Sequence, residues 1–241
     1  MTDLDASPGW LRAVAAEVSG FDRSSTAERV AEVLRRRITD GDLPPGSRLS
    51  EEQLVQVLQV SRNTLRESFR LLTHEGLLVH QLHRGVFVRV LDEDDLVDLY
   101  RLRRAVECAV VRSLTGGEPL DPLGDDVAAA ERAAVDGDWR AVGTANMRFH
   151  SHLVGLAGSR RLDEVTARLL AELRLAFSAV ASPEHLHAPY VGRNRALLAL
   201  LEAGEVERAA AELDGYLDDS LAELLAAVRE GRTPRQQGGR L

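Results

Sequence analysis

The chain contains no lysine, and arginine supplies all 30 of its basic residues. Cysteine occurs once, as Cys108 in an apolar helical run, so no intramolecular disulfide can form, which fits a reducing compartment. We interpret this thiol as a small core residue, because no activating base stands near it in the sequence. Runs of about 20 apolar residues, which membrane-spanning helices need, are missing, and the acidic start has no apolar signal segment. We therefore expect a cytoplasmic protein that is not inserted in a membrane.

The formal net charge of −8 is unevenly distributed along the chain. Residues 24–90 hold 10 arginines against 8 acidic residues, whereas residues 91–241 hold 18 arginines against 26 acidic residues. The overall negative charge argues against indiscriminate nucleic-acid binding. A mildly basic segment attached to an acidic one favours DNA contact by the first part only.

The stretch from residue 61 to residue 78 has two faces at helical spacing. Leu65, Phe69 and Leu72 form an apolar stripe, Ser61 is a suitable N-cap, and Gly76 is a suitable stop. The other face carries groups that suit base edges and phosphates, because arginine forks onto guanine and asparagine onto adenine. An ordinary amphipathic surface helix has the same pattern. If this helix reads DNA, its candidate contacts are Arg62, Asn63, Thr64, Arg66 and Arg70.

The segment before this helix favours the DNA-reading interpretation. Residues 24–40 predict a helix, which the glycine and proline residues of the stretch 41–46 end. Ser50 and Gln53 form a capping box that opens a short second helix. Two helices joined by a tight turn at residues 59–60 make a helix-turn-helix, whose second helix presents its first residues to the major groove.

The segment after the helix predicts a wing. Residues 77–90 are rich in β-branched and apolar side chains on both sides of a turn at residues 83–85, a pattern typical of a β-hairpin. A helix-turn-helix followed by such a hairpin is a winged helix. At the tip, Arg84 and Gly85 are further candidate DNA contacts, because arginine suits the minor groove and glycine allows a close backbone approach.

Residues 24–90 resemble the DNA-binding domain of the GntR family of bacterial transcription regulators. The likeness rests on GDLPPGSRLSE at 41–51, VSR at 60–62, LRE at 65–67, EGL at 75–77 and RGVFV at 84–88. It implies that double-stranded operator DNA is a partner and that Arg62, Arg66 and the wing contact it. The chain departs from the family pattern at Glu52, where many members carry a DNA-contacting arginine, at Gln59, where glycine is usual, and at Asn63-Thr64, where Thr-Pro is common. The operator sequence is therefore not transferable from relatives.

The chain changes character at Asp92. Residues 92–95 give an acidic start to a long helix that is expected to reach Thr115, which suits the helix dipole. Its apolar stripe is predicted to comprise Leu96, Leu99, Leu102, Val106, Val110 and Leu114. Further helices are expected at about residues 124–136, 138–157, 160–181, 190–203 and 205–230. Because no strand pattern appears, we expect an all-α bundle that can enclose a pocket between helices.

The predicted fold is therefore mainly α, with an N-terminal winged helix-turn-helix that contains a small β-hairpin and a C-terminal helical bundle. We expect an arm or extra helix at residues 1–23 and a DNA-binding domain at 24–91. An effector-binding and dimerisation domain should follow at 92–230. Residues 231–241 lack apolar content and are expected to be a disordered tail.

The second half is similar to the FCD ligand-sensing domain, which defines the FadR-type branch of the GntR family. The likeness rests on residues 99–103 with Glu107, on Phe149-His150 and on helix spacing through Leu217. It implies a homodimer and, in many members, a divalent metal held by an aspartate and three histidines. The equivalent positions here are Asn146, His150, Asn194 and Tyr216.

This set of side chains is a poor metal site. One imidazole, two neutral amides and a phenol do not supply the imidazoles, thiolates or carboxylates that Zn²⁺ and comparable cations prefer. We therefore expect no bound metal and no cofactor. His152 lies two residues from His150 and should face elsewhere. His185 and His187 are expected in a solvated loop after Pro183.

The same polar side chains predict a metal-free pocket for a polar metabolite, because buried amides and phenols must be hydrogen-bonded. Arg103 is a candidate clamp for a carboxylate, since a guanidinium fork matches a carboxylate. It could equally pair with Glu107 four residues further along the helix. A small polar organic acid is the expected effector, and the candidate effector-binding residues are Arg103, Asn146, His150, Asn194 and Tyr216.

The leading interpretation is a metabolite-responsive transcription regulator, a homodimeric repressor that an organic acid releases from its operator. One alternative is a constitutive DNA-binding regulator whose bundle only dimerises. A second is a helical enzyme fused to a DNA-binding module. We expect no enzyme, because the sequence contains no nucleophile elbow, phosphate loop or paired His-Glu metal motif.

Overall fold

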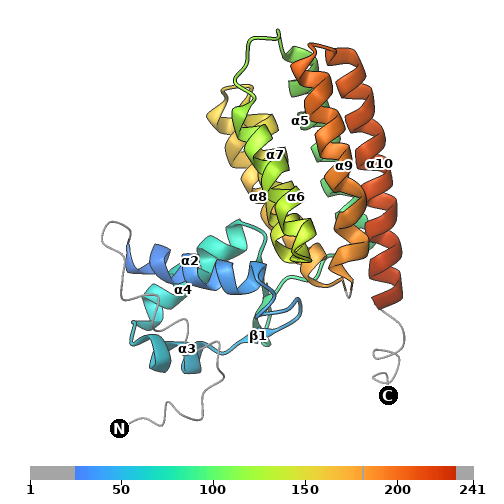
Figure 1. The fold of residues 1–241 in the computed structure, drawn as a ribbon. Coiled ribbons are helices and arrows are strands. Elements are labelled where there is room, and N and C mark those ends of the chain that lie inside the picture. The colour runs from blue at the N-terminus through green and yellow to red at the C-terminus, as the bar shows by residue number, and fades with distance from the viewer. Residues whose placement is uncertain (1–24, 181, 232–241) are drawn as a thin grey trace. The chain divides into compact units, whose positions relative to one another are not determined.

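The computed structural model describes residues 25–180 and 182–231, and the chain divides into two compact units between Leu91 and Asp92 (Figure 1). The arm expected at residues 1–23 lies outside the described residues, as do residues 232–241 of the expected tail. Gly231, which we expected to open the tail, is the last residue of α10 (Val206–Gly231). Within the described ranges, no helix is long and apolar enough to cross a membrane.

The first unit combines three helices with a small sheet. Its elements are α2 (Thr26–Thr39), β1 (Arg48–Leu49), α3 (Glu51–Leu58), α4 (Arg62–His74), β2 (Leu78–Gln81) and β3 (Gly85–Val88). A serine caps each helix: Ser25 forms a capping box with Glu28, and Ser50 and Ser61 accept amides of the first turns of α3 and α4. The apolar stripes of α2 and α4 pack on each other and are almost fully buried. The predicted helix-turn-helix is confirmed as α3 and α4.

The wing is a three-stranded antiparallel sheet in the order β1-β3-β2. The predicted hairpin forms between β2 and β3, with Gln81 paired to Gly85 at the turn. Leu82, which we assigned to the apolar wing pattern, lies in the turn and is 76% exposed. The two-residue strand β1 was not predicted, because its pairing with residues 86–87 depends on a partner far along the chain.

The second unit is all-helical, as predicted, and its helices run side by side as a bundle (Figure 1). They are α5 (Glu93–Ser113), α6 (Asp121–Val135), α7 (Trp139–Gly155), α8 (Arg160–Ser178), α9 (Pro183–Glu202) and α10. Asp92 opens the unit by forming a capping box with Asp95. Small residues line the contact between α6 and α7, where Ala130, Ala133 and Ala145 are buried and allow a close approach.

The inward face of α5 differs from the predicted apolar stripe. Leu102, which we placed in that stripe, is 41% exposed, whereas Arg103 and Glu107 are each 2% exposed. The helix turns these two charged side chains inward because they pair with each other and with groups on other helices, which offsets the cost of their burial.

Helix α9 begins seven residues earlier than predicted, with Pro183 in its first turn. The solvated loop expected around His185 and His187 is therefore wrong. Both residues lie in the helix, and His187 is only 6% exposed. Pro189 lies inside this helix, but its missing amide removes only one helical hydrogen bond, and the helix continues past it.

Candidate functional site

The start of α4 presents a polar face to solvent. Arg62 and Asn63 are exposed, and neither side chain makes a hydrogen bond or ion pair with any residue that the structure describes. Thr64 differs from them, because its hydroxyl lies 2.8 Å from Ser61 Oγ and its amide donates to the same oxygen. The cap therefore orients the first turn and leaves Arg62 and Asn63 available for a partner.

Two further arginines on α4 are each held by a carboxylate. Arg66 Nε donates to Glu51 Oε1 on α3 at 2.9 Å, and Arg70 pairs with Glu67 one turn earlier at 2.7 Å. Both arginine side chains remain largely exposed. Their heads therefore have a preferred direction before any partner arrives. Sequence reasoning did not identify Glu51 as a site residue.

The wing tip has a backbone shape that glycine and a short turn favour. Gly85 has a φ of +106° and His83 a φ of +59°, both in the left-handed region. Arg84 is exposed, and its guanidinium lies 5.4 Å from the centre of the Phe87 ring. Arg48 of β1 passes close to the tip, since a Cβ on Gly85 would lie 3.6 Å from Arg48 Nε. Arg84 and Gly85 thus lie where the sequence placed them.

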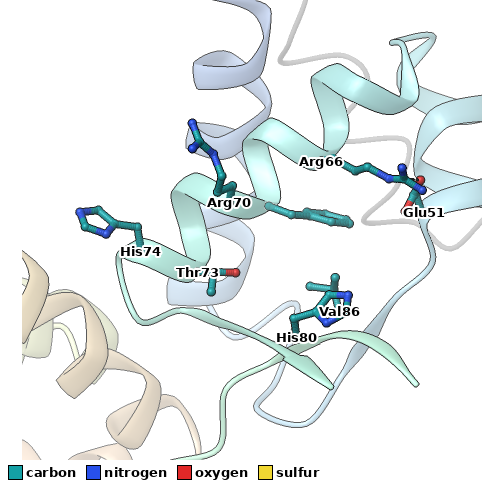
Figure 2. Close-up of a pocket in the computed structure, with 8 residues that line it drawn as sticks. Glu51, Arg66, Arg70, Thr73, His74, His80 and Val86 are labelled. Atoms are coloured by element: carbon teal, nitrogen blue, oxygen red, sulfur yellow. Dashed lines mark hydrogen bonds and ion pairs between the residues drawn. The ribbon is translucent and has the colours of Figure 1, made fainter. Parts of the chain in front are cut away.

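A groove of about 560 Å³ runs between α4 and the wing (Figure 2). Its walls include Phe69 on the helix and His80 and Val86 on the strands. Its remaining lining residues are Glu51, Arg66, Arg70, Thr73 and His74. No sequence pattern indicated His74 or His80 as site residues, because their placement in the groove depends on how the hairpin packs against α4.

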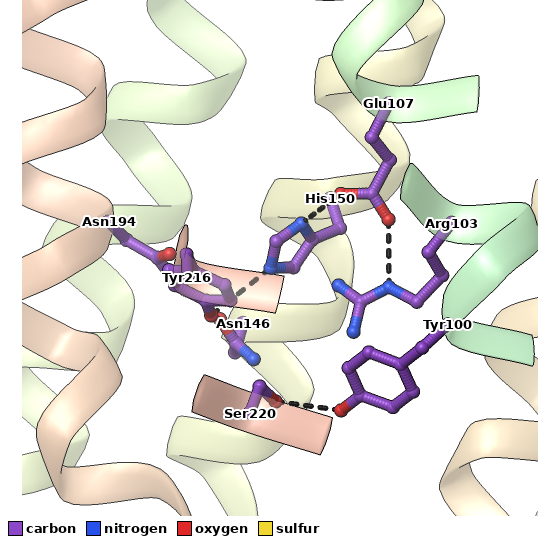
Figure 3. A network of polar contacts seen from close by, with 8 residues as sticks. All are labelled: Tyr100, Arg103, Glu107, Asn146, His150, Asn194, Tyr216 and Ser220. Atoms are coloured by element: carbon purple, nitrogen blue, oxygen red, sulfur yellow. Dashed lines mark hydrogen bonds and ion pairs between the residues drawn. The ribbon is translucent and has the colours of Figure 1, made fainter. Parts of the chain in front are cut away.

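A second group of polar side chains meets inside the bundle (Figure 3). Arg103 and Glu107 come from α5, Asn146 and His150 from α7, Asn194 from α9, and Tyr216 from α10. All five residues that we predicted as effector-binding belong to this group, and Glu107 joins them. Five of the six are only 1% or 2% exposed, and Asn146 is partly buried. Helical spacing explains the pairs on α5 and α7, whose members lie four residues apart.

A chain of hydrogen bonds links this group from α5 to α9. Arg103 Nε donates to Glu107 Oε1 at 2.8 Å, and Glu107 Oε2 lies 2.7 Å from His150 Nδ1. Tyr216 then bridges His150 and Asn146: its hydroxyl is 3.1 Å from His150 Nε2 and 2.9 Å from Asn146 Oδ1. Asn194 Nδ2 donates to Asn146 Oδ1 at 2.6 Å, whereas the buried Asn194 Oδ1 has no hydrogen-bond partner among the described residues.

The charges in this group balance. Burial alone would raise the pKa of Glu107, but Arg103 and His150 outweigh it and lower that pKa to about 2. Burial lowers the pKa of His150, and although Glu107 opposes this, the imidazole stays below its ordinary pKa and is neutral at pH 7. The pKa of Arg103 is raised, because Glu107 outweighs the effect of burial. The group therefore holds one positive and one negative charge.

The sequence left two roles open for Arg103, and the pair with Glu107 is the one present. Its Nη atoms point away from α5 toward the side chains of the other helices (Figure 3). Tyr100 lies beside it, with the guanidinium 5.0 Å from the ring centre, and its hydroxyl lies 2.7 Å from Ser220 Oγ. Glu107 thus uses only the Nε edge of the guanidinium.

The donor set of this group does not fit a divalent metal. His150 is its single imidazole, and its Nε2 atom faces the Tyr216 hydroxyl. Within the part of the chain that the structure describes, no group of three or more His, Cys, Asp or Glu side chains is arranged to hold a metal ion. His152 faces elsewhere, as expected, with its Nδ1 2.6 Å from Asp126 Oδ2.

Comparisons with known proteins agree with this architecture. Residues 26–88 match the family described as "Bacterial regulatory proteins, gntR family", and residues 98–219 match the FCD domain. The chain is 30% identical, over 76% of its length and 78% of the relative's, to an HTH-type transcriptional regulator from an unstable DNA locus of Streptomyces ambofaciens. It is 29% identical to the probable D-xylose utilization operon transcriptional repressor of Paenarthrobacter nicotinovorans, over 78% of this chain and 83% of that one.

A solved structure is similar over nearly its whole length. The crystal structure of a GntR transcriptional regulator from Rhodococcus sp. RHA1 has a TM-score of 0.81 and 40% sequence identity, and covers 85% of this chain and 99% of its own. The winged helix-turn-helix, the helical bundle and both family matches lead to one assignment. The chain belongs to the GntR family of bacterial transcription regulators, and its second unit carries an FCD domain.

Proposed function

We propose that this DNA-binding regulator is a repressor that leaves its operator when a small polar organic acid binds between α5, α7, α9 and α10. The observation that carries the effector site is the buried hydrogen-bonded group around Tyr216. Six polar side chains converge inside the bundle, where burying apolar side chains would cost less free energy. A structural role alone does not require so many. The repressor name of the relative from Paenarthrobacter nicotinovorans supports the direction of regulation.

Arg103, Asn146, His150, Asn194 and Tyr216 are the proposed effector contacts. The Nη edge of Arg103 would receive the carboxylate, since guanidinium and carboxylate form parallel hydrogen bonds. The unpartnered Oδ1 of Asn194 would accept a hydrogen bond from a hydroxyl on the same ligand. Because the charges of Arg103 and Glu107 balance, we expect an acid of low charge that also carries hydroxyl groups.

Operator contacts are proposed for the start of α4 and for the wing tip. Arg62 and Asn63 would read bases in the major groove, because their side chains are exposed and unpaired among the described residues. The other proposed contacts are Thr64, Arg66, Arg70, Arg84 and Gly85. A homodimer acting in the cytoplasm would bind a short palindrome, with two copies of α4 about one DNA turn apart.

The DNA part of the proposal is tested by selecting an operator from random duplexes with the wild-type protein. Specific binding is expected at a Kd on the order of 10⁻⁸ M or tighter. Arg62→Ala should weaken operator binding by about 1 to 3 kcal/mol, as expected for an arginine that reads a base. Exposed Arg160 on α8 provides a control, since Arg160→Ala should leave the affinity unchanged. Equal binding by wild type and Arg62→Ala would remove α4 from operator reading.

The effector part is tested by thermal stabilisation in a panel of hydroxy acids, followed by operator release. Tyr216→Phe keeps the ring but removes its hydroxyl, and is expected to weaken stabilisation by the acid while operator affinity stays unchanged. Arg103→Ala is a poorer test, because it leaves the Glu107 carboxylate buried without its partner. An acid that stabilises wild type and Tyr216→Phe equally would place the effector elsewhere.

A constitutive regulator whose bundle only dimerises is the second candidate. One observation favours it: His150, Tyr216 and Asn146 hydrogen-bond to one another, so these three side chains do not need a ligand to be satisfied. The same panel separates the two candidates, because a constitutive regulator would bind its operator identically with and without every acid. We do not propose catalysis, since the Tyr216 hydroxyl, which lies beside His150, donates to Asn146 Oδ1, and burial raises its pKa, which disfavours the phenolate nucleophile.

A further inference from the structure

Glu51 and Arg66 connect the two helices of the helix-turn-helix. Glu51 is the first residue of α3, and Arg66 lies in the second turn of α4. Arg66 Nε donates to Glu51 Oε1 at 2.9 Å, and the two residues are 15 positions apart in the chain. Figure 2 shows Arg66 reaching along the helix toward Glu51, away from Arg70 and His74. The contact therefore fixes a long side chain at the helix surface.

The Glu51 carboxylate is itself well anchored. It follows the N-cap Ser50, and the first turn of a helix favours negative charge because the exposed amides point at it. Its side chain is only 34% exposed, compared with 64% for that of Arg66. Glu52, the next residue, is exposed and has no ion pair among the residues that the structure describes. Neighbouring acids on one helix turn thus differ in their contact with Arg66.

The contact leaves one edge of the guanidinium open. Glu51 takes the Nε side, so the edge formed by the two Nη atoms stays available for a partner. Guanine presents two acceptors, O6 and N7, that match this edge. An arginine already held in place loses less side-chain freedom when it binds, and its direction is set before contact.

We propose that Glu51 is a positioning residue that holds Arg66 in the direction needed to read a base of the operator. The inference rests on the proposed role of α4 in operator reading. A carboxylate near DNA also repels phosphates, so its two effects have opposite signs. Glu51 raises discrimination between sequences while it lowers affinity for DNA in general. A residue that only stabilised the fold would instead support binding to every sequence alike.

The test compares Glu51→Gln, Glu52→Gln, Arg66→Ala and the double variant Glu51→Gln/Arg66→Ala. Each full-length protein is titrated with the operator selected by wild type and with a scrambled duplex of the same composition. Glu51→Gln is expected to lower the ratio of operator to scrambled affinity about tenfold, near the lower end of what one bidentate contact contributes. Affinity for the scrambled duplex should not fall.

The controls separate positioning from charge and from folding. Glu52→Gln removes the same charge one residue away, so it should change both affinities alike and leave their ratio unchanged. In the Arg66→Ala background, Glu51→Gln should have no further effect on the ratio. The inference is overturned if Glu51→Gln keeps the wild-type ratio of affinities or lowers the affinity for both duplexes equally. It is also overturned if Glu51→Gln lowers the ratio further in the Arg66→Ala background. If Arg66→Ala alone keeps the wild-type ratio, Arg66 reads no base and the inference fails. Operator reading by Arg62 is tested separately, by Arg62→Ala.

Discussion

Tyr216 places its hydroxyl 3.1 Å from His150 Nε2, while Glu107 holds the Nδ1 atom of the same ring at 2.7 Å. In metal centres, histidine commonly binds the ion with one nitrogen and a carboxylate or carbonyl with the other. The carboxylate half of that arrangement is present here. On the other side of the ring, a phenol stands where an ion would bind, which explains why the imidazole can be hydrogen-bonded without a metal.

Protein purified without chelator is therefore expected to hold well under one equivalent of divalent metal by elemental analysis. Restoring an aspartate and three histidines with Asn146→Asp, Asn194→His and Tyr216→His should create a site for Zn²⁺, because the Glu107–His150 pair already orients one ligand. Adding His150→Ala to that variant should abolish the binding. Stoichiometric metal in wild type that is lost in His150→Ala would contradict the expectation.

Removing Arg103 is expected to destabilise the bundle strongly. Arg103→Ala leaves a carboxylate that is 2% exposed without its guanidinium, and breaking a buried pair in this way costs about 3 to 5 kcal/mol. Changing both partners, with Arg103→Met and Glu107→Gln, should cost less than the two single changes together, because neither charge is then left alone. Urea unfolding of the wild type, Arg103→Met, Glu107→Gln and the double variant measures this coupling. If the losses in unfolding free energy are additive, the interaction between the two side chains contributes nothing to stability.

Acid should weaken the bundle through His187. Burial, with a smaller effect from Arg174, lowers the pKa of His187 from 6.5 to about 4. Between these values the unfolded chain binds a proton that the folded chain excludes, so stability is present above about pH 6.5 and falls as pH is lowered toward 4. The loss is at most about 3 kcal/mol, since one pKa unit corresponds to about 1.4 kcal/mol.

The measurement is the free energy of unfolding at several pH values through this window. His187→Leu should flatten the dependence, while His185→Gln, an exposed change two residues away on α9, should leave it as in wild type. His150 also has a lowered pKa, so part of the slope should remain in His187→Leu. An unchanged slope in His187→Leu would show that this imidazole binds its proton equally well in the folded and the unfolded chain.

Local signals explain how much of the fold could be predicted. The N-cap serines and the stops at Gly41 and Gly76 depend on neighbours within a few residues, so the sequence places α2 and α4 to within about two residues. The predicted apolar stripe of α5 was right for Leu96 and Val110, which are buried, but wrong for Leu102, which is exposed. Periodicity also treats Arg103 and Glu107 as surface residues, although both are buried. Their burial depends on Tyr100, His150 and the other helices, which no local pattern reveals.

The candidate site residues also differ in whether the sequence could predict them. The effector candidates came from helical spacing and from family positions, and four helices bring them together as expected. The contact between Glu51 and Arg66 could not be predicted, because it joins residues of two helices through a turn whose geometry is set by the fold. The left-handed backbone of that turn had only one sign in the sequence: Gln59 stands where glycine is usual in the family.

Gln59 joins α3 to α4 with a φ of +52°, in the left-handed region. A side chain with a Cβ pays roughly 1 to 2 kcal/mol there, whereas glycine does not. Glycine also gives the unfolded chain more freedom, which offsets about half of that gain. Gln59→Gly should therefore stabilise the first unit by about 1 kcal/mol and slow amide hydrogen exchange in α3 and α4.

Gln56→Gly is the matched control: Gln56 is exposed inside α3, where the backbone is helical, so the same change should destabilise by about 1 kcal/mol. Faster exchange in both variants would show that the turn holds Gln59 through contacts of its side chain, which outweigh the strain of its backbone.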